Sequence, residues 1–145
     1  MIRIVVYGLP APQGSKRYVG TSKAGRGILV ESSKAVKPWR EAVKSAALEQ
    51  VAGQSPLDGP LAVRMVFTLP KPASAPKKRR TWPCRKPDAS KLARSTEDAM
   101  TDAGVWIDDA RIVRLEAIKA YPLEAGGSLD RPGAVITIAQ VVERP

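Results

Sequence analysis

Acidic residues flank one short stretch of a chain that is otherwise strongly basic. Asp88 precedes the stretch 89–103, and Asp108 and Asp109 follow it. The chain has no histidine and a single cysteine, Cys84, which excludes histidine-based catalytic triads and CxxC zinc sites. Any bound metal must therefore be a hard cation held by oxygen ligands, such as Mg²⁺.

Hydrolysis of a phosphodiester bond without histidine requires a divalent metal, which neutralises the phosphate and activates a water molecule. Carboxylates at the two ends of 89–103 could hold such an ion, within one subunit or together with other acids. The structural alternative is that Asp88 only caps a helix and that Asp108 and Asp109 only form a turn. The spacing alone leaves both interpretations open.

Excess positive charge points to a polyanionic partner. Lys and Arg number 24 against 14 Asp and Glu, a net charge of +10, which favours nucleic acid. Between residues 77 and 94 there are eight basic residues and one acid. We expect the following residues to contact DNA: Lys16, Arg17, Lys77, Lys78, Arg79, Arg80, Arg85, Lys86 and Lys91.

Apolar runs are too short for a membrane span, and no signal peptide is visible, so we expect a cytoplasmic protein without a membrane partner. Trp82 lies within the basic run between residues 77 and 94. We expect it to pin this part of the chain, with stacking on a nucleobase as the alternative.

The stretch after Asp88 has the pattern of an amphipathic helix. Asp88 is suited to the N-cap, where its side chain can accept hydrogen bonds from the first turn. Apolar or small residues then recur at three- and four-residue spacing, and Gly104 is suited to end the helix. Residues 105–107 are apolar, so we expect this short segment to tie the chain down after the helix. The stripe consists of Leu92, Thr96, Ala99, Met100 and Ala103.

The remaining elements follow from apolar periodicity. Alternation predicts strands over 2–9, 61–69, 111–121 and 134–142, with a short strand at 28–30. Val36, Trp39, Val43, Ala46 and Ala47 recur at helical spacing, and Trp39 is expected in the core.

Segments between these elements are richer in glycine, proline and charge. Residues 10–27 and 70–87 predict basic loops, and 123–133 predicts a hairpin-like connection between the last two strands. The whole chain, 1–145, therefore predicts one small mixed α/β domain. Its order is β-α-β-α-β-β, with two main helices on one face of a four-stranded mixed sheet.

The run KPDASKLARSTEDAMTDAGVWIDDARIV resembles the RusA-like Holliday junction resolvases, including their phage-borne branch. That family has the motif D-x-D-[NK]-L at a helix start, continues through D-A-L/M and ends G-x-[WI]-x-D-D-x-x-V. PAPQGSKR and VKPWREAV are also similar to phage members. The matching residues are Asp88, Lys91, Leu92, Asp98, Ala99, Gly104, Asp108, Asp109 and Val113.

This resemblance implies a homodimeric endodeoxyribonuclease of a bacterial or phage-infected cell. Such an enzyme depends on Mg²⁺, with Mn²⁺ as a substitute. It would recognise four-way or other branched DNA by shape and cut opposed strands. The resemblance implies that Asp88 and Asp109 are catalytic metal ligands, that Asp108 assists, and that Arg94 contacts phosphate.

Ser90 departs from the family motif, which has a second aspartate at this position. A neutral hydroxyl is a poor Mg²⁺ ligand, whether it binds directly or through water. Three outcomes are open: reduced activity, replacement by another acid such as Asp108 or Glu97, or a protein that binds junctions without cutting them. Ser90 shares a helix face with Arg94, four residues on, so it stays at the site. An RNA-binding protein is a weaker alternative, because it leaves the acids unexplained.

Overall fold

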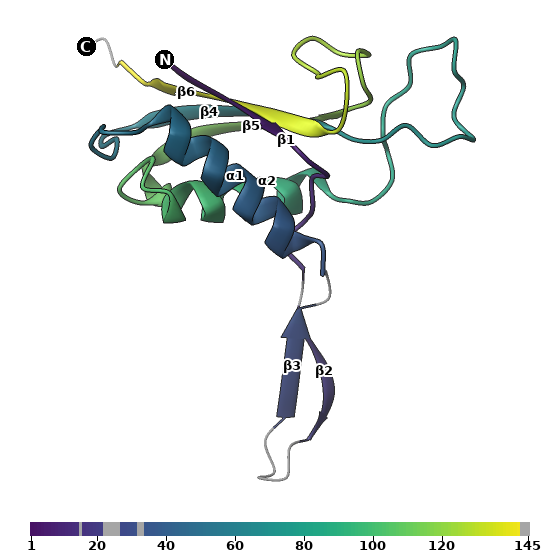
Figure 1. Cartoon of the computed structure of the whole chain (residues 1–145), viewed down its shortest axis with the longest axis horizontal. Coiled ribbons are helices and arrows are strands. Elements are labelled where there is room, and N and C mark those ends of the chain that lie inside the picture. The colour runs from purple at the N-terminus through teal and green to yellow at the C-terminus, as the bar shows by residue number, and fades with distance from the viewer. Residues whose placement is uncertain (15, 22–26, 32–33, 143–145) are drawn as a thin grey trace.

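A four-stranded sheet carries both helices on one face (Figure 1). The computed structural model describes residues 1–14, 16–21, 27–31 and 34–142. The observed order confirms the predicted α/β fold. Its elements are β1 (Ile2–Tyr7), α1 (Val36–Gln50), β4 (Leu61–Thr68), α2 (Ala89–Asp102), the short 3-10 helix η1 (Asp109–Arg111), β5 (Ile112–Ala120) and β6 (Gly133–Gln140).

The sheet is mixed, with strand order β1-β6-β4-β5. β5 runs parallel to β4, whereas β6 lies antiparallel between β1 and β4. The prediction of a hairpin between the last two strands is therefore wrong. Parallel neighbours need a crossover, which α2 supplies between β4 and β5. β5 is exposed along much of its length, as with Val113 at 63%, so it suits the sheet edge.

A second, two-stranded sheet interrupts the segment 10–27. Strand β2 (Lys16–Thr21) pairs antiparallel with β3 (Gly27–Glu31), and the pair points away from the main sheet in Figure 1. The short strand expected at 28–30 is confirmed within β3. The loop prediction is wrong for 16–21, because these residues have no apolar period and owe their strand form to pairing with β3.

Trp39 anchors α1 to α2 in the core. Its side chain is 1% exposed, and its Nε1 donates a hydrogen bond to Thr96 Oγ1 at 3.2 Å. The predicted apolar stripe of α2 is buried, so Trp39 and the stripe are both confirmed as core. Gly104 follows with φ +75°, a conformation that glycine adopts without strain.

The other face of the sheet is covered in part by the connection between β5 and β6. Val66 points to this face and is 1% exposed. Thr68 is fully buried there, and its Oγ1 accepts a hydrogen bond from Leu129 N at 2.8 Å. Among the described residues, no helix is both long and apolar enough to cross a membrane.

Gly133 is expected to tolerate no side chain. A Cβ there would collide with the main-chain oxygen of Val6 and press on Leu129. Because the neighbour is backbone in β1, we expect Gly133→Ala to lower the free energy of unfolding by about 2 kcal/mol, as for overpacked cores. Urea denaturation of both proteins measures the difference.

Gly126→Ala is the matched control, because a Cβ at Gly126 meets nothing within 4 Å. Its unfolding free energy should stay within about 0.5 kcal/mol of the wild type. Equal stability of the Gly133 and Gly126 variants would contradict the register between β1 and β6.

Candidate active site and DNA-binding surface

Asp88 begins α2 with its carboxylate available to a ligand. Its backbone has the extended N-cap conformation (φ −71°, ψ 138°), and its main-chain oxygen accepts from Leu92 N at 3.0 Å. The side chain makes no capping hydrogen bond, so that part of the prediction is wrong. It lies instead 3.9 Å from Lys91 Nζ and is 52% exposed.

Asp108 and Asp109 form an adjacent pair of acids before β5. Asp108 Oδ1 accepts a hydrogen bond from Ala110 N at 2.8 Å, which lowers the pKa of Asp108. The pKa of Asp109 is raised, first by its hydrogen bond with Asp108, then by partial burial and by the negative charges of Asp108 and Asp98. Asp109 is therefore a carboxylate whose ionised form the fold disfavours and a cation would favour.

Glu97 belongs to the same acidic region. Burial raises its pKa most, followed by the negative charges of Asp109 and Asp98, whereas Arg94 lowers it. Arg94 and Ser90 are both exposed on α2. Arg94 therefore lies close enough to Glu97 to act on its charge.

Asp88 does not join this group. Lys119, near the end of β5, donates hydrogen bonds to the oxygens of Arg85 (2.8 Å) and Pro87 (2.9 Å), whereas Asp109 lies just before the start of β5. The ten residues from Asp88 to Asp98 rise about 15 Å along α2. Within the described residues, no three acidic side chains form a group that could hold a metal ion.

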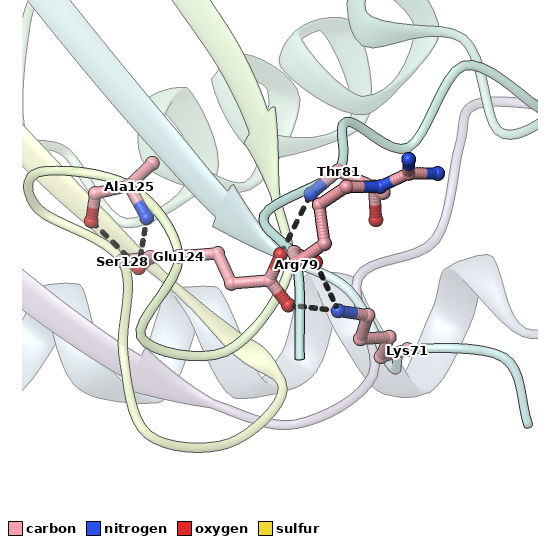
Figure 2. A network of polar contacts seen from close by, with 6 residues as sticks. All are labelled: Lys71, Arg79, Thr81, Glu124, Ala125 and Ser128. Carbon is pink, nitrogen blue, oxygen red and sulfur yellow. Dashed lines mark hydrogen bonds and ion pairs between the residues drawn. The ribbon is translucent and has the colours of Figure 1, made fainter. Parts of the chain in front are cut away.

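The basic loop, residues 70–87, is fastened to the connection between β5 and β6 by Glu124 (Figure 2). Glu124 accepts from Lys71 Nζ at 2.6 Å and from Thr81 N at 2.8 Å, and Lys71 also donates to Arg79 O at 3.2 Å. The Lys71 and Glu124 side chains are each 18% exposed. Ser128 closes the neighbouring turn by exchanging hydrogen bonds with the main chain of Ala125.

This fastening leaves the predicted DNA-contacting side chains on the outside. The side chains of Lys16 and Arg17 lie outside the described part of the chain. Those that are described are all exposed: Lys77, Lys78, Arg79, Arg80, Arg85, Lys86 and Lys91.

Trp82 is not what holds the basic loop. Its side chain is 54% exposed, and the Arg80 guanidinium lies 4.5 Å from its ring centroid. The expectation that Trp82 pins the loop is therefore wrong, and Glu124 has that role. Local sequence pattern does not indicate this role, because Glu124 and Lys71 are 53 residues apart and Glu124 lies in a glycine-rich connection without apolar periodicity.

Glu124→Gln is expected to loosen the basic loop. The substitution removes the charge that pairs with Lys71, so trypsin should cut after Lys77 to Arg80 several times faster than in the wild type. Glu116→Gln is the matched control, because Glu116 pairs with Arg64 in an exposed contact at 3.5 Å. Equal cutting rates in both variants would show that Glu124 does not hold the loop.

Acid should release the same contact. The hydrogen bond from Lys71, with that from Thr81 N, holds the pKa of Glu124 below its ordinary range. The contact therefore persists above the ordinary pKa of about 4.3 and is lost as the pH falls through the lowered value.

Comparison with known proteins identifies the family. The family model described as Endodeoxyribonuclease RusA matches residues 8–138, which include both helices, the basic loop, β4, β5 and most of β6. A comparison with curated proteins found no match. The chain therefore belongs to the RusA family of Holliday junction resolving endodeoxyribonucleases, enzymes of DNA recombination and repair.

Proposed function

We propose that this protein acts as a homodimer that uses Mg²⁺, or Mn²⁺ in its place, to cut opposed strands of a four-way DNA junction in the cytoplasm of a bacterial or phage-infected cell. The observation that carries the proposal is the crowded Asp109 carboxylate within a chain of the RusA family. Two related sites are needed for symmetric cutting, and a two-fold axis supplies them.

Nucleases of this family generally depend on a metal, and the donor set here suits a hard cation. Asp88, Asp108 and Asp109 offer exposed carboxylate oxygens. Mg²⁺ often takes one or two protein carboxylates and fills its shell with water and phosphate, so a cage of three acids is not required. When bound, the ion would supply charge neutralisation and an activated water.

Each residue has a distinct proposed role. Asp109 would be the principal ligand, because it gains most from a nearby cation, and Asp108 would orient it through their hydrogen bond. Asp88 would hold metal or water at the other end of α2, with Ser90 as a weak neighbouring ligand. Arg94 would bind a phosphate beside the acids.

Exposed cations would position the DNA. Lys77, Lys78, Arg79 and Arg80 lie in the fastened basic loop, and Arg85, Lys86 and Lys91 lie around Asp88. We propose that Lys16 and Arg17 extend this contact from β2. Contacts with phosphate hold the duplex without reading its sequence, which suits an enzyme that recognises shape.

Ser90 favours a second candidate function. With a hydroxyl in place of the family's second aspartate, the protein could bind junctions and cut them slowly or not at all. DNA affinity would then resemble that of an active relative, while cleavage would be low.

A cruciform extruded from a supercoiled plasmid distinguishes paired cutting from single nicks. Two cuts across one cruciform give linear DNA, whereas independent single cuts give nicked circles. With Mg²⁺ we expect mainly linear product and a dimer by light scattering. Nicked circles alone, or a monomer that cuts in pairs, would contradict the homodimer.

A further inference from the structure

An apolar cavity of about 350 Å³ is lined by the residues that lead into Asp88. It forms where the exit of β1, the start of α1, the end of β4 and the basic loop meet, and Lys86 and Pro87, which immediately precede Asp88, line it. Leu9 stands at its wall with 57% of its side chain exposed, and Tyr121 lines it while only 7% exposed. The cavity is therefore open to a ligand, and its wall ends one residue before a proposed catalytic carboxylate.

The walls suit a flat, weakly polar ring. Most lining side chains are aliphatic, and six are prolines, which bring rigid rings and no N–H donors. Tyr121 adds an aromatic side chain, and the Lys71 ammonium lies 5.9 Å from its ring centroid. Rigid apolar walls lose little conformational freedom when a ring enters. The prolines are Pro10, Pro12, Pro70, Pro72, Pro83 and Pro87.

The charge around the cavity selects DNA as the source of that ring. Arg85 and Lys86 line the cavity and are exposed, and Lys91 lies one turn beyond Asp88. A nucleotide brings a phosphate that Arg85 and Lys86 can pair with, whereas an apolar or basic protein surface would leave both cations without a counter-charge. Charge complementarity thus favours a nucleotide over a protein partner.

We infer that this cavity takes up one unstacked nucleobase from the branch point of the DNA. The base lies between Leu9 and the prolines, and its flanking phosphates contact Arg85 and Lys86. This inference rests on the proposed role of Asp88, since uptake of the base would place the adjoining phosphodiester next to that carboxylate. Few polar groups line the cavity, so the base is held by its face rather than by its edge.

The test uses 2-aminopurine at the branch point of a synthetic four-way junction, in EDTA so that no strand is cut. Binding of the full chain should raise its fluorescence, because the base leaves its stacked neighbours. The same base placed within an arm should show no rise. Leu9→Ala should weaken junction binding about tenfold, the size expected when part of one apolar side-chain contact is lost, and leave duplex binding unchanged.

Two further variants make the test specific to the cavity. Ala35→Trp places a large side chain at an exposed lining position and should abolish the rise. Leu48→Ala removes another exposed leucine (47% exposed) from α1, away from the cavity, and should change nothing.

Several results would overturn the inference. These are tight binding without a rise at the branch point, a rise that survives Ala35→Trp, or loss of the dimer in Leu9→Ala, which would make the cavity an interface between copies. Cleavage in Mg²⁺ separates the two claims. Cutting without base uptake leaves the proposed function standing, and base uptake without cutting removes the proposed function alone.

Discussion

Asp109→Asn is expected to reduce cleavage of a four-way junction in Mg²⁺ by at least about 100-fold, since even residues that only support metal ligands are worth 10- to 100-fold. The substitution replaces an anionic oxygen donor, which lies among the negative charges of Asp108 and Asp98, with a neutral amide. Single-turnover cleavage of an end-labelled junction measures the change.

The substitution should not unfold the protein. A raised pKa means that the ionised Asp109 destabilises the folded state near neutral pH, so a neutral amide should keep the unfolding free energy the same or raise it. Junction affinity in EDTA should also be retained. Asp102→Asn, which changes an exposed acid of α2 paired with Arg40, is the control and should cut at the wild-type rate. Normal cutting by Asp109→Asn would remove Asp109 from the site.

Ser90→Asp is expected to increase cleavage about tenfold, the lower end of what such a group contributes to a metal site. Ser90 is exposed in the first turn of α2, so an added carboxylate meets water rather than the core. It would lie two residues from Asp88 and one turn before Arg94. The same single-turnover assay gives the rate, and a Mg²⁺ titration should show saturation at lower concentration.

Ser45→Asp provides the matched control, because it adds the same charge to an exposed serine of α1. It should leave cleavage unchanged and weaken DNA binding slightly at low salt. If Ser90→Asp cuts no faster than the wild type, then the serine is not what limits this enzyme.

Local pattern was sufficient to predict the elements whose own side chains form the core. The stripe of α2, the alternation of β4 and the burial of Trp39 all follow from apolar spacing. Pairing between strands that are far apart in the sequence could not be predicted from local pattern. β2 depends on β3 for its strand form, and β6 pairs with both β1 and β4, which are distant from it in the sequence.

The same distinction between local pattern and long-range contacts applies to the candidate site. Asp88, Asp108 and Asp109 were identifiable because carboxylates stand out in a chain without histidine. Their arrangement was not, because it depends on the length of α2 and on where β5 begins. The role of Glu124 in holding the basic loop could not be predicted, because its partners Lys71 and Thr81 lie far away in the sequence.

The most direct test of the whole account is cleavage of an end-labelled four-way junction by the wild-type protein, with Mg²⁺ and with EDTA, beside a linear duplex of the same sequence. We predict symmetric cuts near the branch point with Mg²⁺, none with EDTA, and none in the duplex. A junction that binds tightly yet stays intact in both Mg²⁺ and Mn²⁺ would contradict the account.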